Sequence, residues 1–553
     1  MGRTDGAATG RIENVPPICA DGAATGRIDN APPMRTGGVQ LDNIKIGMAS
    51  LGCPKNQVDG EAMLGMLRAL GCQITPDADS ADLIIVNTCG FIDTAKKESI
   101  DVILEMAEKK KSGRCRAIVA TGCLTERYRE SFRAELPEVD AILGTGEYGR
   151  ICEVVRALAA AKGLTSGTDS DAVKTGNEPL VAGRPVFECD ASQRLGHLNA
   201  GRVLTGAPGA VYIKIAEGCD NRCAYCIIPQ IRGPYISRSA SDIISEAERL
   251  AAQAKLAHAA GSAAAERLAA QAELAHAAGS AAYGNAQARG GIEATLVAQD
   301  TTAYGFANAR QKTTELCELI DKLSSIDGIN WIRLLYGYPD RVDAMLIKKF
   351  AEGGKLLRYL DLPVQHASDG VLRAMGRRYT GDDLYELIGA LRREAPGMVL
   401  RTTLITGFPG ETDGDFEKLL EFVKWAAFER LGVFTYSREE GTAAAKIAGS
   451  VPKKIAKARR AALLKVQAGI TARYETSRIG HEYEALIESG PSPAPGGAIF
   501  FTARTYAEAP QIDGAVRVYS NVDRACGAVF PGCFVNIKIT GADAAGLTGE
   551  VTT

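Results

Sequence analysis

The sequence has no long apolar run, almost no net charge and few histidines. No stretch approaches the roughly 18 consecutive apolar residues of a membrane-spanning helix, and the opening MGRTDGAATGRIEN lacks the apolar core of a signal peptide. Lysine and arginine total 64 against 66 aspartate and glutamate, a net charge of −2, which does not favour a general nucleic-acid binder. We expect a cytoplasmic monomer that does not associate with membranes.

Cysteine, in contrast, is abundant, with 14 residues in 553. In a cytoplasmic chain this predicts cluster ligands and buried thiols rather than disulfides. Three stand close together in the run CDNRCAYC, as Cys219, Cys223 and Cys226. Three thiolates on one tight loop can hold three irons of a four-iron cluster and leave the fourth iron open. The alternatives are three structural thiols or a zinc knuckle, but zinc usually adds a second cysteine pair or histidines, and no histidine lies between His197 and His258.

Three further cysteines each follow a predicted strand. The apolar runs at 45–51, 82–87 and 116–121 are typical of buried parallel strands, and they end at three loop cysteines, Cys53, Cys89 and Cys123. Ligands of open α/β sheets bind at the carboxyl ends of the strands, so cysteines far apart in sequence can converge there. Three separate buried thiols are the alternative. The shared position of these cysteines, each beside a glycine, favours a second cluster.

Composition and periodicity predict an α/β multidomain protein. Residues 1–43 carry a tandem repeat of DGAATGRI and bury little apolar surface, so we expect them to be disordered. Residues 44–160 predict an open parallel α/β sheet, and 161–204 a linker. Residues 205–470 alternate strands and helices, which predicts a partial (β/α)6 barrel. Residues 471–553 contain short strands separated by glycine and proline, which predicts a small antiparallel β-barrel. The six predicted barrel strands are 210–215, 292–298, 331–336, 359–366, 401–406 and 431–437.

A second tandem repeat lies at 248–283, inside the predicted barrel. ERLAAQA at position 248 returns at position 266, and its period of 18 residues equals five helical turns. We expect this duplicated insertion to lengthen one outer helix, with breaks at Gly261 and Gly279. His258 and His276 occupy equivalent positions and are expected to face solvent. A partner-binding arm is the alternative.

The cysteine motifs carry a resemblance to a known family. KIAEGCDNRCAYCIIPQIRGPYISR, with SLGCPKN, VNTCGFI and TGC at the strand ends, resembles the methylthiotransferases among the radical S-adenosylmethionine (SAM) enzymes. The resemblance implies that the loop cysteines hold a 4Fe-4S cluster whose open iron binds SAM, and that one electron cleaves SAM to a 5′-deoxyadenosyl radical. It implies that the strand-end cysteines hold a second 4Fe-4S cluster, which supplies the sulfur. A reductant protein such as flavodoxin or ferredoxin is the implied partner.

Three segments of the predicted barrel resemble family segments that line the SAM and substrate pocket. They are LVAQDTTAYG, LDLPVQHASD and GFPGET. The resemblance implies that residues of these segments face the pocket, and the alternative for each is a structural hydrogen bond at a strand end. The residues are Gln299, Asp300, Gln365, His366 and Glu411.

The same resemblance bears on the substrate. SLGCPKN is more similar to the branch that modifies ribosomal protein S twelve of the 30S subunit than to the tRNA branch. The implied reaction replaces a β-hydrogen of an aspartate with a methylthio group and uses two SAM molecules. One departure is Asp59-Gly60-Glu61, where the family usually has Asp-Ser-Glu.

The C-terminal segment resembles a TRAM domain and carries six lysines and arginines against nine carboxylates. This balance fits a basic protein substrate better than RNA, because phosphate contacts dominate RNA affinity. One alternative is a methylthiotransferase acting on N6-isopentenyladenosine of tRNA. The other is a non-catalytic iron–sulfur electron carrier or scaffold.

Overall fold

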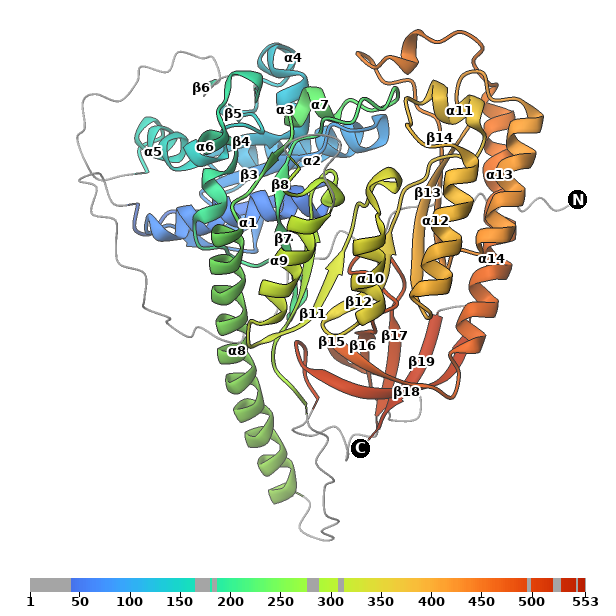
Figure 1. Ribbon diagram of the computed structural model, residues 1–553. Helices are drawn as coiled ribbons and strands as arrows, with labels where there is room; N and C mark the ends of the chain where they lie inside the picture. The colour runs from blue at the N-terminus through green and yellow to red at the C-terminus, as the bar shows by residue number, and fades with distance from the viewer. Residues whose placement is uncertain are drawn as a thin grey trace, which may run out of the picture.

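The structure is a computed structural model that describes residues 41–164, 180–181, 186–275, 288–306, 313–494, 499–520, 529–543 and 546–552. A parallel α/β sheet, a six-stranded parallel barrel sheet and a closed β-barrel follow one another along the chain (Figure 1). This confirms the predicted fold class. Most of the predicted disordered segment lies outside the described residues. No helix of the described part is long and apolar enough to cross a bilayer.

The N-terminal sheet has the strand order β2-β1-β3-β4-β5-β6, and its pairs are parallel. Every residue of β3 and β4 is buried, because helices cover both faces of the sheet. The strands are β1 (Lys45–Ser50), β2 (Gln73–Ile74), β3 (Leu83–Thr88), β4 (Ala117–Gly122), β5 (Ala141–Leu143) and β6 (Leu180–Val181). The helices are α1 (Pro54–Ala69), α2 (Asp93–Ser112), α3 (Cys123–Arg127), α4 (Arg129–Glu135) and α5 (Ile151–Ala161), and a short α6 (Ala191–Leu195) leads to the barrel.

The central sheet has the order β14-β13-β12-β11-β10-β7, with parallel pairs throughout. A short hairpin of β8 (Ala216–Glu217) and β9 (Ile236–Ser237) flanks α7 (Ile228–Arg232). The strands are β7 (Ala210–Lys214), β10 (Ile292–Val297), β11 (Ile329–Leu334), β12 (Leu356–Asp361), β13 (Val399–Thr406) and β14 (Arg430–Thr435). The helices around them are α8 (Ala240–Ala275), α9 (Thr314–Ser324), α10 (Ala344–Glu352), α11 (Asp369–Ala374), α12 (Gly381–Glu394), α13 (Asp413–Ala426) and α14 (Lys453–Ser477).

The duplicated insertion extends α8, which is a single helix of 36 residues. The predicted break at Gly261 is wrong, because the helix continues through this residue. One glycine costs a helix only about 1 kcal/mol, and its neighbours here are mostly alanine, a strong helix former. His258 is half-buried rather than fully exposed, and its ring centroid lies 5.0 Å from that of Phe530 in the C-terminal part. His276 and Gly279 lie outside the described residues.

The C-terminal barrel closes in the order β15-β16-β17-β19-β18. Its pairs are antiparallel except β17 with β19, which is parallel. The strands are β15 (Glu482–Pro493), β16 (Ile499–Arg504), β17 (Val516–Ser520), β18 (Phe534–Asp543) and β19 (Gly546–Val551). A small β-barrel is the architecture predicted for the C-terminal segment, although one of its pairs is parallel.

Helices cover one face of the central sheet, and the other face is closed by its two neighbours in the chain. Tyr212, Trp331 and Tyr359 project from β7, β11 and β12 into this second apolar cluster. Val58 of α1 packs into the cluster from the N-terminal part, and Phe534 from the C-terminal barrel. The three parts of the chain therefore share one core, and α1 lies against the inner face of the central barrel.

Close packing of α1 predicts the effect of one small substitution. A Cβ added at Gly65 would lie 1.5 Å from the carbonyl oxygen of Gly201, whereas a Cβ at Gly389 of α12 meets no neighbour within 4 Å. Gly65→Ala should lower the free energy of unfolding by about 1–3 kcal/mol, the usual cost of overpacking. Gly389→Ala should raise it by up to about 1 kcal/mol, because alanine favours the helix. Urea unfolding of both variants measures the difference, and equal stabilities would contradict the close contact of α1.

Candidate active site

The three loop cysteines lie between β8 and α7, at the carboxyl end of the first barrel strand. The Cys219 amide donates to the carbonyl of Gly233 at 3.1 Å, and the Ala224 amide donates to that of Met375 at 2.8 Å. The Cys226 amide closes a turn onto the carbonyl of Cys223 at 3.0 Å. The loop is therefore held from both sides by backbone hydrogen bonds.

Burial decides the ionisation of these thiols. It raises the pKa of Cys219 and of Cys226 to about 12, and the neighbouring Cys223 thiol adds to both shifts. Without a bound cation the two thiols stay protonated at neutral pH, so a metal group must displace their protons. A set of three soft sulfur donors suits an iron–sulfur cluster. The loop therefore fits the group that its sequence predicts.

The three strand-end cysteines converge, although they lie 36 and 34 residues apart in sequence. Cys53 precedes α1, and Cys123 begins α3. A Cβ added at Gly52 would lie 3.2 Å from the sulfur of Cys89, which shows how closely the first two loops meet. Burial raises the pKa of Cys89 to about 12, with further contributions from the Cys123 and Cys53 thiols. The carboxyl edge of the N-terminal sheet thus gathers three thiols.

Cys53 differs from the other thiols of this set. Its burial acts to raise the pKa, but the cations of Lys55 and Arg232 outweigh burial, so the pKa of Cys53 lies below its ordinary value. A lowered pKa marks a thiol that is readily converted to a thiolate, the form that binds metal. Among the described residues, no three histidine, cysteine, aspartate or glutamate side chains are arranged to share one metal ion. The thiolates that hold a four-iron cluster lie farther apart than the ligands of a single ion, because each thiolate binds a different iron.

Arg232, the last residue of α7, connects the segment after the loop cysteines to the strand-end cysteine Cys123. Its Nε donates to the Cys123 sulfur at 3.3 Å, and its Nη2 donates to the Asn56 side chain at 2.8 Å. Its Nη1 donates to Asp59 of α1 at 2.7 Å and to Glu217 of β8 at 3.0 Å. Cys123 also packs against Ile227, the residue after Cys226. The strand-end cysteine Cys123 therefore lies against the segment that directly follows the loop cysteines.

The carboxylates around Arg232 belong to a fully buried ion network. Asp59 accepts from Lys214 at 2.5 Å and contacts His197 Nε2 at 2.9 Å. Burial acts to raise the pKa of Asp59, but Lys214 and Arg232 outweigh it and lower that pKa strongly. Arg232 and Lys214 likewise outweigh burial at Glu217 and lower its pKa. Both carboxylates are therefore charged at neutral pH.

This network was not predicted from the sequence. There, Asp59 and Glu61 are notable only because they match the two acidic residues of the Asp-Ser-Glu motif on either side of Gly60. In the structure, Glu61 accepts from Arg202 at 2.5 Å and from the Thr205 amide at 2.8 Å, so it ties α1 to the segment before the barrel. The sequence feature that could have indicated this network is Lys214, a charged residue inside the apolar strand AVYIKI. A buried charge in a strand requires a partner.

Two of the predicted pocket residues contact the cysteine loop. Gln299 donates to Glu217 at 2.6 Å, and its own carbonyl oxygen is buried with no hydrogen-bond partner among the described residues. Asp300 accepts from Asn221, between Cys219 and Cys223, at 2.7 Å, and it also pairs with Arg341. Asp300 therefore holds the cysteine loop in place, while Gln299 has a free acceptor.

The other predicted pocket residues follow strands β12 and β13. Strand β12 ends at Asp361, so Gln365 and His366 lie in the turn beyond it, and Gln365 has a positive φ of 68°. His366 is fully buried, and its Nδ1 accepts from the Ser368 amide at 3.0 Å. Burial lowers the pKa of His366 to about 4, so the ring is neutral with its proton on Nε2. That nitrogen has no hydrogen-bond partner in the described part of the chain.

Glu411 is engaged within its own loop. Its carboxylate accepts from the amides of Gly407 and Phe408 and pairs with Arg459 at 3.1 Å. Burial nevertheless raises the pKa of this carboxyl above its ordinary value. These contacts are those of a residue that shapes the loop after β13.

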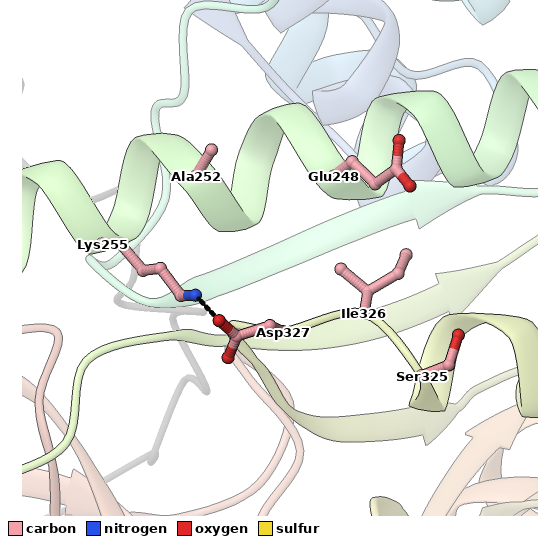
Figure 2. Close-up of a pocket in the computed structure, with 6 residues that line it drawn as sticks. All are labelled: Glu248, Ala252, Lys255, Ser325, Ile326 and Asp327. Atoms are coloured by element: carbon pink, nitrogen blue, oxygen red, sulfur yellow. Dashed lines mark hydrogen bonds and ion pairs between the residues drawn. The ribbon is translucent and has the colours of Figure 1, made fainter.

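A separate hollow of about 350 Å³ lies on the outside of the barrel (Figure 2). Glu248, Ala252 and Lys255 of α8 line one side, and the turn before β11 lines the other, where Asp327 pairs with Lys255. This turn is at the amino end of β11. Active sites of parallel barrels form at the carboxyl ends of the strands, so the hollow is not part of the cysteine site.

A parallel barrel sheet whose edge strand runs into a three-cysteine loop is the arrangement of radical SAM enzymes, and the model of the Radical SAM superfamily matches residues 213–423. The models of the uncharacterized protein family UPF0004 and of the TRAM domain match residues 45–144 and 479–552. Ribosomal protein uS12 methylthiotransferase RimO of Acetivibrio thermocellus is 42% identical over 507 residues, which cover 92% of this chain and 98% of the relative.

Two further relatives have the same name. The protein of Desulforudis audaxviator is 41% identical, with 90% of this chain and 95% of the relative covered. The protein of Pelotomaculum thermopropionicum is also 41% identical, with 92% and 99% covered. The chain belongs to the family of ribosomal protein uS12 methylthiotransferases.

The buried network predicts a large effect of removing Arg232. Arg232→Met leaves Asp59 and Glu217 with one cation fewer in a buried site, and loss of one partner from a buried ion pair costs about 3–5 kcal/mol. Arg393→Met is the matched control, because Arg393 of α12 pairs with Glu394 at the surface, where such pairs contribute less than about 1 kcal/mol. Urea unfolding of both variants tests this. Similar losses in the two would show that the network does not hold the parts together.

Proposed function

We propose that this protein replaces a β-hydrogen of an aspartate in ribosomal protein uS12 with a methylthio group and consumes two SAM molecules. The observation that carries the proposal is that Arg232, six residues after Cys226, donates to the sulfur of Cys123 at 3.3 Å, while Cys123 packs against Ile227, next to Cys226. Membership in the uS12 methylthiotransferase family supports the protein substrate over tRNA, because the three relatives compared above bear that name.

Each set of cysteines is proposed to hold one 4Fe-4S cluster. The loop cysteines, Cys219, Cys223 and Cys226, would leave one iron open for SAM, and the strand-end cysteines, Cys53, Cys89 and Cys123, would hold the second cluster. The bound groups supply the electron that cleaves SAM and the sulfur that is inserted. The protein's own part is to bind, orient and enclose these groups.

The side chains at the barrel mouth have distinct proposed roles towards SAM and substrate. Gln299, with its free carbonyl oxygen, would accept a hydrogen bond, and His366, with its free Nε2–H, would donate one. Gln365 lies beside His366 and would face the same space. Asp300 would act by fixing the cysteine loop, and Glu411 by shaping the loop after β13.

The remaining partners follow from this reaction. A flavodoxin- or ferredoxin-like protein would supply the electrons, and a substrate of the 30S subunit would place the enzyme in the cytoplasm as a monomer. The carboxylate excess of the C-terminal segment does not add support. Several of its carboxylates pair with arginines of the barrel and of α14, as Glu508 does with Arg430 at 3.2 Å and with Arg478.

Single cysteine substitutions separate the two proposed clusters. Cys223→Ala should abolish SAM cleavage, because the loop would keep only two thiolates. Cys89→Ala should still form 5′-deoxyadenosine but give no methylthiolated product. Iron analysis, 5′-deoxyadenosine assay and product mass spectrometry distinguish the variants. Persistent SAM cleavage by Cys223→Ala would refute the first assignment, and normal product from Cys89→Ala the second.

A substrate competition tests the proposed function directly. The reconstituted enzyme, with SAM and a reductant, is offered uS12 and tRNA bearing N6-isopentenyladenosine together. We expect mass spectrometry to find a methylthio group on one aspartate of uS12 and none on the tRNA. Product on the tRNA alone would move the enzyme to RNA modification, and SAM cleavage without either product would leave only the radical chemistry.

A further inference from the structure

Lys55 is a buried cation without a carboxylate partner. It is the second residue of α1, two positions after Cys53, and it is only 8% exposed. Its Nζ lies 3.2 Å from the centroid of the Tyr336 ring. Within the described ranges, it forms no ion pair and donates no hydrogen bond to a side chain or carbonyl.

The two buried cations of the Arg232 network are paired. Lys214 contacts Asp59 at 2.5 Å, and Arg232 contacts Asp59 at 2.7 Å. Burying a charge without a partner is costly, because the ring of a tyrosine replaces only part of the lost hydration. A buried ammonium with no carboxylate in direct contact is therefore suited to receive one from a ligand.

The position of Lys55 places it between Cys53 and the carboxyl ends of the barrel strands. Tyr336 follows β11 at the carboxyl end of the barrel strands, and its amide donates to Asp361, the last residue of β12, at 3.1 Å. Lys55 reaches Tyr336 from the opposite side, next to Cys53. Cys53, Arg232, Asp361 and Glu217 are the charged or ionisable groups that surround it. A substrate that enters the barrel mouth would meet Lys55 close to the thiols of the N-terminal sheet.

We propose that Lys55 binds the side-chain carboxylate of the substrate aspartate and so selects aspartate; this rests on the proposed function. The β-carbon of aspartate is bonded directly to the carboxylate carbon. An ammonium that holds the carboxylate therefore also fixes the position of the carbon that is modified. A neutral nucleobase would leave the ammonium unpaired in a buried site, which disfavours adenosine as the substrate.

The test compares two forms of the substrate in two forms of the enzyme. The substrate is uS12 with the modified aspartate intact or replaced by asparagine. Wild-type enzyme should prefer aspartate by roughly 30- to 1,000-fold in kcat/KM, the range for truncating one side of a buried charge pair. Lys55→Met should reduce this preference to less than roughly tenfold, mainly by losing activity on the aspartate form. Lys55→Arg, which keeps the charge, should retain most of the preference.

A control variant and the iron content show whether Lys55 acts on the substrate or on the cluster beside it. Lys97→Met removes an exposed lysine of α2 that pairs with Asp101, and it should behave as wild type. Iron content per chain should be equal in wild type, Lys55→Met and Lys97→Met. A loss of about four irons in Lys55→Met alone would overturn the proposal, because it would show that Lys55 acts by supporting the cluster on Cys53.

The outcomes separate this inference from the proposed function. If wild-type enzyme modifies uS12 and Lys55→Met keeps the full preference for aspartate, the assignment of Lys55 alone is wrong. If wild-type enzyme modifies only tRNA, the proposed function fails and the assignment of Lys55 to an aspartate fails with it. Loss of the preference with unchanged iron content would establish Lys55 as the residue that selects the carboxylate.

Discussion

The arrangement of this protein depends on the ion network buried around Arg232. Asp59 comes from the N-terminal sheet domain, and Glu217, Lys214 and Arg232 come from the start of the barrel. Buried ion pairs rarely add more stability than apolar packing would, because desolvation offsets their attraction. Their geometry is demanding, however, since each misplaced partner leaves a charge unpaired. Such a network suits a site where two cysteine sets must keep a fixed separation.

Ion pairs also hold the C-terminal barrel against the central sheet. Arg504 pairs with Glu293 of β10 at 2.6 Å, and Arg401 of β13 pairs with Asp513 at 3.5 Å. Many of the charges in this nearly neutral chain therefore form ion pairs between domains. The overall charge of one segment consequently says little about its substrate. The six cations and nine carboxylates of residues 471–553 supported a protein substrate only while their partners in the barrel were unknown.

Local patterns made the strands and both cysteine sets predictable. Apolar runs followed by a cysteine locate β1, β3 and β4, and the spacing of the loop cysteines suits a cluster on any fold. The network was not predictable in the same way. Asp59 and Arg232 are 173 residues apart, and no periodicity connects them. The predicted break in α8 was wrong because it considered Gly261 alone. The alanine-rich sequence on both sides of this residue favours a continuous helix.

Family likeness and substrate choice rest on different parts of the molecule. On the proposed function, the cysteines, the barrel strands and the buried network would account for the shared chemistry, because they would position the reactive groups that any substrate of this chemistry needs. Selection requires side chains in the space between the two cysteine sites that are not already paired. In the described structure two buried cations near the cysteines form no ion pair, Lys55 beside Tyr336 and Arg377 beside Tyr225. A cation without a carboxylate in direct contact suits a substrate that brings a negative charge within one bond of the reacting carbon.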